Sequence, residues 1–147
     1  MVYVNFRKLR EGAKTPMRAS AAAAGYDLCA CLEGDGEVRI APHTTVRIGT
    51  GLSIAIPDGY FGAVFARSGL AAKQGLRPAN AVGVCDSDYR GEYIVALHND
   101  GSVEQVIRNG DRIAQLVVMP YLAVDFCEVE ALDETERGDG GFGSTGK

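Results

Sequence analysis

The stretch NAVGVCDSDYRGEYIVALHND, residues 80–100, decides the fold class. Its second half has Tyr93, Val95 and Leu97 at alternate positions, which places them on one face of an extended chain, as in a half-buried strand. Its centre, DSDYRG, consists largely of residues that favour turns. Because apolar runs flank this centre on both sides, the stretch is predicted to be a β-hairpin with an exposed tip.

The same alternation recurs elsewhere in the chain. Leu52, Ile54 and Ile56 repeat it, and so do Val2, Val4 and Phe6 near the start. Turn signals between the apolar runs have the spacing of hairpins in a sandwich or barrel, and they are Pro57-Asp58-Gly59, Asn99-Asp100-Gly101 and Asn109-Gly110. The chain is therefore predicted to be all-β.

Glycine is over-represented and helix-forming segments are scarce. The chain has 19 glycines in 147 residues, and glycine serves turns and close backbone approaches. One short helix is expected from Ser68 to Gly75, with Ser68 as its N-cap and Gly75 as its stop. Residues 19–24 are too few to form a helix alone and are interpreted as a connection.

Length and charge restrict the class of protein. A chain of 147 residues is expected to form one domain with its own core. A net charge of −4 disfavours a binder of nucleic-acid backbones, and no stable nucleic-acid partner is expected. The longest apolar run, residues 116–124, contains Pro120 and is far shorter than the about 20 residues that span a bilayer, so no membrane association is expected.

The N-terminus and the cysteines indicate a reducing compartment. In MVYVNFRKLR the basic residues follow the apolar ones, the reverse of a secretory signal, so a cytoplasmic location is expected. The four cysteines are then expected to be reduced thiols. Cys29-x-Cys31 lacks the usual spacing of zinc ligands, which disfavours a structural zinc site.

Two familiar catalytic or metal-binding patterns fail on inspection. The segment from Asp86 matches part of a calcium loop, but Arg90 and Leu97 stand where oxygen ligands are required. No Gly-x-Ser-x-Gly elbow is present. A hydrolase with this sequence would therefore have to activate water with a carboxylate.

The C-terminus differs from the rest of the chain. We expect a β domain over residues 1–130, followed by an acidic linker and a flexible Gly-rich arm over residues 131–147. The arm contains five glycines in its last eleven residues, together with Arg137, Phe142, Ser144 and Thr145. Those side chains could bind phosphate and a base, but composition alone leaves a merely solvated tail equally open.

Five segments together resemble the motifs of the deoxyuridine triphosphatases known as trimeric dUTPases. Residues 80–92 resemble the hairpin motif of that family. The others occur in family order: AGYDL at 24–28, ARSGL at 66–70, RIAQL at 112–116 and RGDGGFGSTG at 137–146. Ala66 stands where proline is usual and Cys85 where an aliphatic residue is usual, and neither change removes a polar group.

The resemblance implies a fold, an assembly and a reaction. It implies a distorted jelly-roll-like β-barrel of the dUTPase or β-clip type, in a homotrimer whose sites lie at subunit interfaces. It implies Mg²⁺-assisted hydrolysis of dUTP to dUMP and pyrophosphate, which supplies dUMP for thymidylate synthesis and keeps uracil out of DNA.

The resemblance also implies roles for the hairpin residues. Asp86 would be the catalytic base that takes a proton from the water attacking the α-phosphorus, a role that suits an ionised carboxylate. Asn80, with the main chain at Gly83 and Val84, would read the uracil edge. Tyr89 would lie flat against the deoxyribose and leave no room for a ribose 2′-hydroxyl.

A second set would serve the phosphates and the metal. Arg67, Ser68 and Gln115 would hold the phosphate chain or its metal-bound water, and Gly69 belongs to the same substrate-binding set. Asp27 would orient a water of the Mg²⁺ shell, with the ion held mainly by the triphosphate. Positioning and charge neutralisation dominate phosphoryl chemistry, which is the work expected of these groups.

The arm would complete the site. Arg137, Ser144 and Thr145 would close on the terminal phosphates, while Phe142, with Gly143 beside it, covers the uracil. Two alternatives stay open from the sequence. One is a dCTP deaminase or a bifunctional enzyme of the same fold, and the other is a regulatory relative that binds proteins.

Overall fold

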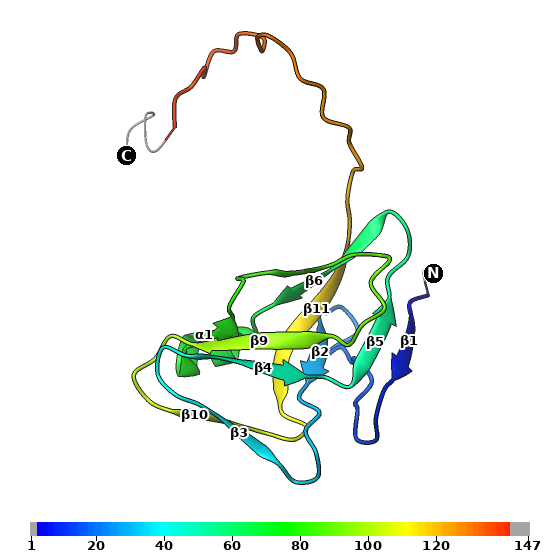
Figure 1. Cartoon of the computed structure of the whole chain (residues 1–147), viewed down its shortest axis with the longest axis vertical. Coiled ribbons are helices and arrows are strands. Elements are labelled where there is room, and N and C mark those ends of the chain that lie inside the picture. Colours follow the sequence, from blue (N-terminus) through cyan, green and yellow to red (C-terminus); the bar gives the residue numbers. More distant parts are fainter. Residues whose placement is uncertain (1–2, 142–147) are drawn as a thin grey trace.

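The computed structural model describes residues 3–141, and residues 1–2 (with Val2 of the predicted first strand) and 142–147 lie outside the described part (Figure 1). The described residues form short strands and one helix. In chain order they are β1 (Asn5–Lys8), β2 (Tyr26–Cys29), β3 (Glu37–Ile40), β4 (Thr45–Gly49), β5 (Leu52–Ala55), β6 (Tyr60–Phe65), α1 (Ser68–Gln74), β7 (Leu76–Pro78), β8 (Gly83–Cys85), β9 (Ile94–Asn99), β10 (Gln105–Arg108) and β11 (Arg112–Pro120). The all-β prediction is confirmed.

The core lies where the alternation predicted it. Leu52 and Ile54 on β5 and Val95 and Leu97 on β9 are buried, and their polar neighbours along each strand are more exposed. They pack into one hydrophobic cluster with residues from most other strands. Burial of apolar side chains from several sheets in one cluster is the main stabilising term of this fold.

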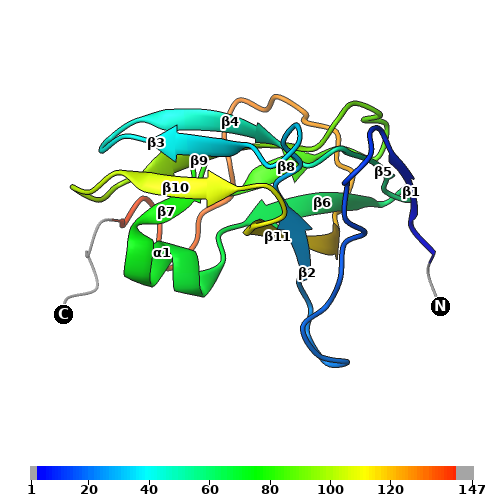
Figure 2. The ribbon, with the colours of Figure 1, turned by 90° about the horizontal axis from the view of Figure 1, so that it is seen from below.

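The strands form four separate sheets and do not close into one barrel (Figures 1 and 2). The sheet orders are β2-β11-β6-β8, β4-β9-β7, β1-β5 and β3-β10, with antiparallel pairing throughout. No pair of hydrogen-bonded neighbours in the described part consists of consecutive strands. The arrangement is compatible with a jelly-roll-like fold, in which long connections join strands of different sheets.

The three predicted turns exist, but the hairpins expected at them are wrong. Gly59 and Gly110 adopt the positive φ angles of tight turns, and Asn99 hydrogen-bonds across its own turn. The strands on either side of each turn nevertheless pair elsewhere, as β5 does with β1 while β6 does with β11 and β8. Turn residues determine where the chain reverses, whereas the meeting of apolar faces determines the partner strand.

Residues 80–100 also differ from the predicted hairpin. β8 pairs with β6, and β9 pairs with β4 and β7, so the two arms of the motif are not bonded to one another. Instead β7 and β9 form the base, with Pro78 opposite Leu97 and the amide of Ala79 donating to the carbonyl of Ala96 at 2.7 Å. Residues 79–93, here called the pocket loop, are thus anchored at both ends.

The single helix is present and its stop is as predicted. α1 packs beside β7 on the outside of the strands, and Gly75 ends it with a φ of 66°, in the left-handed region that favours glycine (Figure 2). The predicted N-cap is wrong, because Ser68 is the first helical residue and Arg67 is the cap. Arg67 makes no side-chain capping bond, since a guanidinium has no atom that accepts from a helix amide, and it donates to Asp27 instead.

Both ends of the described chain leave apolar groups uncovered. All four residues of β1 are exposed, so the predicted half-burial of Phe6 does not occur within this chain. After β11 the chain leaves the strands, and every residue from 121 to 139 is exposed (Figure 1).

The residues 19–24 form turns and bends, which confirms a connection. None of the helical residues described forms a segment long and apolar enough to cross a membrane.

Candidate functional site

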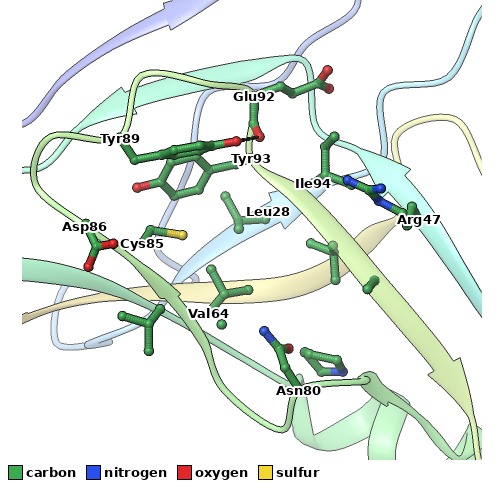
Figure 3. A pocket seen from close by; sticks show the side chains of 15 residues that line it. Leu28, Arg47, Val64, Asn80, Cys85, Asp86, Tyr89, Glu92, Tyr93 and Ile94 are labelled. Atoms are coloured by element: carbon green, nitrogen blue, oxygen red, sulfur yellow. Dashed lines mark hydrogen bonds between the residues drawn. The ribbon is translucent and has the colours of Figure 1, made fainter.

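A cavity of about 260 Å³ lies between the pocket loop and strands β2, β4, β6 and β9 (Figure 3). It brings together the predicted uracil, sugar and base residues of the 80–92 motif. These are Asn80, Gly83, Val84, Asp86 and Tyr89. Asn80 and Asp86 reach the cavity from the two sides of β8, as Figure 3 shows. The sequence motif is therefore one site in space.

A strained turn positions Asn80. Ala81 has a φ of 60°, which is unusual for a residue with a Cβ, and the amide of Val82 donates to the carbonyl of Asn80 at 2.6 Å. A bond from residue i+2 back to residue i closes a three-residue turn. Strain of this kind persists where surrounding structure holds it and is frequent at binding sites. No sequence pattern pointed to Ala81.

Asp86 carries an exposed carboxylate that accepts no hydrogen bond and forms no ion pair within residues 3–141. Its main chain is fixed, since its carbonyl accepts from the amide of Tyr89 at 3.2 Å. Arg90 fixes the same turn by donating to the carbonyl of Ser87 at 2.6 Å. Arg90 is structural, as expected, but it acts through carbonyls rather than through an ion pair.

Tyr89 folds back over the loop that carries it. Its hydroxyl donates to the carbonyl of Glu92 at 2.9 Å, and a Cβ at Gly91 would lie 2.4 Å from that hydroxyl oxygen. Glycine is required at residue 91 for this reason. The Tyr89 ring is 43% exposed and faces the cavity mouth (Figure 3).

An ion pair ties the end of the loop to the N-terminal segment. Glu92 accepts two bonds from Arg10, at 2.6 and 3.0 Å, and one from the amide of Gly51 at 2.8 Å. The hydrogen bonds from Arg10 hold the pKa of Glu92 below its ordinary value, and partial burial opposes them. A Cβ at Gly49 would lie 2.4 Å from the Glu92 carboxylate, so a glycine leaves space for this pair.

The inner wall of the cavity is less polar. Cys85 and Tyr93 line it together with Leu28 and Val64. Burial raises the pKa of the Cys85 thiol and of the Tyr93 hydroxyl, so both stay protonated at neutral pH. All four cysteines of the chain are free thiols.

The predicted phosphate and metal residues form a second group, here called the Asp27 cluster. Asp27 on β2 accepts from Arg67 at 2.8 Å and from Arg112 at 3.1 Å. Gln115 lies opposite Asp27 in the β2–β11 ladder and donates to the carbonyl of Ala66 at 2.8 Å. A Cβ at Gly25 would lie 2.3 Å from the amide oxygen of Gln115, which explains a glycine there. Ser68 and Gly69 are exposed next to Arg67, at the start of α1.

The two groups lie at opposite ends of β6. Cys85 on β8 pairs with Gly62, so Asp86 lies level with the start of β6, while Arg67 follows its end. At about 3.3 Å per residue, the five residue steps from Gly62 to Arg67 cover at most about 17 Å of extended chain. No residue of the Asp27 cluster lines the cavity at the pocket loop.

Few side chains that could bind a metal ion lie close together in the described part of the chain. Residues 3–141 contain no group of three or more His, Cys, Asp and Glu side chains that could enclose a metal ion. Mg²⁺ typically keeps several waters and binds one or two carboxylates together with substrate phosphates. The arrangement therefore fits only an ion held mainly by a phosphorylated ligand, with Asp27 as the nearby carboxylate.

The arm residues are only partly described. Arg137 donates to the carbonyl of Gly140 at 2.9 Å within a local turn and touches neither group. The predicted arm residues Phe142, Gly143, Ser144 and Thr145 lie outside the described residues.

Sequence reasoning missed several residues of the site. Arg47, Tyr93 and Ile94 line the cavity, and Arg10 anchors the loop from a position far away in the sequence. Burial of Tyr93 was foreseen from its alternation with Val95, but its contact with the loop was not. Arg10 and Arg47 carry no motif signal, because only the folded chain brings them to the loop.

The chain is similar to known proteins in sequence and in fold. The family model described as dUTPase matches residues 11–146. The deoxyuridine 5′-triphosphate nucleotidohydrolase of Desulfitobacterium hafniense (strain DCB-2) is 55% identical over 134 residues, which cover 90% of this chain and 87% of the relative.

Two solved structures of staphylococcal phage enzymes are also similar. A mutant dUTPase of Staphylococcus bacteriophage 80alpha with dUpNHpp has a TM-score of 0.86 and 26% identity, and covers 100% of both chains. A mutant dUTPase from phage phi11 of S. aureus, described with a structural Mg(II) ion, has a TM-score of 0.79 and 25% identity, and covers 88% of this chain and 98% of that one.

Proposed function

Because this chain belongs to the dUTPase family and hydrolyses dUTP to dUMP and pyrophosphate, we propose that Asp86 is the base of that reaction. Asp86 takes a proton from a water molecule, the water oxygen bonds to the α-phosphorus, and the bond from that phosphorus to the bridging oxygen of pyrophosphate breaks. The observation that carries this assignment is its free carboxylate at the cavity. Asp27, in contrast, has both carboxylate oxygens already bonded by arginines.

The cavity at the pocket loop takes the uracil and the deoxyribose. Its volume of about 260 Å³ is below the roughly 300–1,000 Å³ typical of complete small-molecule sites, so a nucleoside fits but its triphosphate must extend outside. Asn80 reads the uracil edge with the main chain at Gly83 and Val84. Tyr89 covers the sugar and excludes a 2′-hydroxyl.

The Asp27 cluster takes the phosphates. Arg67, Ser68 and Gln115 bind phosphate oxygens or a metal-bound water, with Gly69 beside them. When phosphate arrives, Arg67 leaves Asp27 for the phosphate, and Arg112 remains on Asp27. A Mg²⁺ ion held by the triphosphate would neutralise phosphate charge, and Asp27 would orient one of its waters.

We place each complete site at an interface between two chains of a homotrimer. The support is the separation along β6, because Arg67 and Asp86 of one chain lie too far apart to act on neighbouring atoms of one substrate. Uncovered apolar surface supports association of copies. The exposed residues after β11 include Leu122, Val124 and Phe126, whose alternation is that of a strand without a partner in this chain.

The arm completes the site on substrate binding. Arg137 binds terminal phosphate with Ser144 and Thr145, and Phe142, followed by Gly143, covers the uracil. Within residues 3–141 the side chain of Arg137 bonds only to the carbonyl of Gly140 in its own turn, so it can exchange a neutral carbonyl for a charged phosphate partner, which forms stronger hydrogen bonds.

A substrate panel tests the function. Pyrophosphate release is measured with dUTP, UTP, dTTP and dCTP, each with and without Mg²⁺, and ammonia release is measured with dCTP. We expect efficient hydrolysis of dUTP alone, enhanced by Mg²⁺, because a methyl group or a 2′-hydroxyl has no space in the cavity. Efficient hydrolysis of dTTP would contradict the uracil site, and ammonia from dCTP would indicate a deaminase.

A further inference from the structure

The ring of Tyr89 needs support that its own position does not supply. It is 43% exposed and lies on a loop without regular structure between Asp86 and Tyr93. Within residues 3–141 the side chain of Tyr89 makes one hydrogen bond, from its hydroxyl to the carbonyl of Glu92. An exposed ring that excludes a single hydroxyl group must be held to a fraction of an ångström, so the surface beneath it matters.

Tyr93 supplies that surface. Its ring centroid lies 6.0 Å from that of Tyr89 with the planes tilted by 44°, a favourable aromatic arrangement, and Figure 3 shows the two rings over one another. Tyr93 is only 3% exposed. Every substitution that removes its ring would leave the inner side of Tyr89 without a packing partner at this position.

The main chain holds Tyr93 rigidly. Its amide donates to the carbonyl of Leu52 at 2.8 Å, and its carbonyl accepts from the amide and the hydroxyl of Thr50 at 3.1 and 2.7 Å. Thr50 is itself fully buried. Tyr93 is therefore attached to the turn between β4 and β5, outside the pocket loop, and can act as a fixed reference for Tyr89.

The hydroxyl of Tyr93 does not explain the residue. It is buried and makes no hydrogen bond to nitrogen or oxygen within residues 3–141, although buried tyrosine hydroxyls usually do, and its polar neighbour is the thiol of Cys85, a weak partner. A Cβ at Gly62 would lie 3.2 Å from this oxygen, so the neighbouring strand leaves room for it without bonding to it. The ring, rather than the hydroxyl, is what the packing uses.

We propose that Tyr93 is a positioning residue for sugar selection, which holds the Tyr89 ring where it excludes a ribose 2′-hydroxyl. The inference rests on the role proposed above for Tyr89. Tyr93 also lies in the inner wall of the cavity, and its effect on sugar selection is inferred to act through the position of the Tyr89 ring. Its effect is therefore expected in the discrimination between UTP and dUTP rather than in the rate with dUTP.

Two substitutions separate the ring from the hydroxyl. Tyr93→Phe keeps the ring and removes only the unpartnered hydroxyl, so the ratio of kcat/KM for UTP to that for dUTP should stay within about twofold of the original. Tyr93→Leu keeps an apolar side chain but removes the aromatic face, so the same ratio should rise about tenfold or more. Melting temperature is measured for both variants.

Two controls distinguish positioning from general loss of stability. Ile107→Val changes a buried residue on β10, outside the pocket lining, and should lower the melting temperature without changing the UTP to dUTP ratio. In a Tyr89→Ala background, adding Tyr93→Leu should not change the ratio further, because the ring that Tyr93 positions is already gone.

The outcomes are decisive. The inference is supported if Tyr93→Leu alone raises the ratio of kcat/KM for UTP to that for dUTP, and if adding Tyr93→Leu to Tyr89→Ala raises this ratio no further. If Tyr89→Ala relaxes selection and Tyr93→Leu does not, the inference is wrong while the proposed role of Tyr89 stands. If Tyr93→Phe relaxes selection as much as Tyr93→Leu, the hydroxyl is responsible and the inference is overturned. If Tyr89→Ala changes nothing, the proposed role of Tyr89 fails and this inference fails with it.

Discussion

The pocket loop and the Asp27 cluster differ in the interactions that hold their side chains. The loop is shaped by main-chain hydrogen bonds, close glycine contacts and a strained Ala81, and it leaves the Asp86 carboxylate without a partner in the described chain. The cluster is closed on itself, because Arg67 and Arg112 both bond to Asp27. In the proposed function the loop binds a neutral base and sugar, whereas Arg67 of the cluster exchanges the Asp27 carboxylate for phosphate and Arg112 stays on Asp27.

The largest expected effect is at the free carboxylate. Asp86→Asn keeps the size of the side chain but removes the proton acceptor, so turnover of dUTP should fall about 10²-fold or more while binding persists. Steady-state pyrophosphate release and equilibrium binding measure the two effects. Asp88→Asn is the matched control, since it makes the same change two residues along the loop outside the cavity. Near-normal turnover of the Asp86 variant would show that Asp86 is not the catalytic base.

The arginines of the cluster should differ from one another. Arg67→Gln removes a charged donor to phosphate, and such bonds contribute about 1.5–3 kcal/mol, so KM for dUTP should rise roughly 10- to 100-fold. Arg112→Gln should raise KM less, because Arg112 remains on Asp27 and donates no hydrogen bond to phosphate in the proposed site. Equal increases in KM for the two variants would show that the exchange of Arg67 from carboxylate to phosphate does not occur.

Asp27 is expected to act on the metal dependence more than on the nucleotide. Asp27→Asn keeps a hydrogen-bonding group but loses the charge that orients a metal-bound water, so half-maximal activity should require about tenfold more Mg²⁺. Activity is titrated against Mg²⁺, and dUTP binding is measured without metal. If metal-free binding weakens as much as the Mg²⁺ response, Asp27 serves only as a structural partner of the arginines.

The sequence predicted which strand faces are buried better than it predicted which strands pair. Alternation is a local pattern, so the buried faces at Leu52 and Val95 were predicted correctly, and Gly75 marked the end of α1 for the same reason. Strand partners are non-local, and residues 80–100 carried no signal that β8 would pair with β6 instead of with β9.

The motif residues of the site were predicted through resemblance, but their supports were not. Asn80, Asp86 and Tyr89 do line one cavity. Arg10 reaches Glu92 from 82 positions away, and Tyr93 looked like an ordinary core residue. Such contacts depend on the final packing of several sheets, and a single sequence does not contain that information in any local window.

The smallest expected effect concerns the anchor of the loop. Arg10 lowers the pKa of Glu92, so the pair stabilises the fold above the ordinary glutamate pKa of about 4.3, and this contribution is lost as pH falls through the lowered pKa of the folded state. Glu92→Gln should cost about 1 kcal/mol at pH 7, because Arg10 is partly exposed to solvent. Urea unfolding at pH 7 and pH 3 measures it. The difference between the two proteins should be smaller at pH 3 than at pH 7, and a constant difference would assign the cost to packing.

The central claim is that a free base on one chain and a cation cluster on another form one site. Asp86→Asn subunits, which bind dUTP but turn it over slowly, and Arg67→Gln subunits, which bind it weakly, are given different affinity tags, mixed by refolding, and purified through both tags. Activity is measured at a dUTP concentration well below the KM of the Arg67 variant, where each parent alone is nearly inactive. In a cyclic trimer of mixed composition, one interface of three then joins an intact Asp86 to an intact Arg67, so about one third of the wild-type activity should return. If assemblies carrying both tags stay as inactive as their parents, Asp86 and Arg67 of the same chain serve the same substrate, and the two-chain site is wrong.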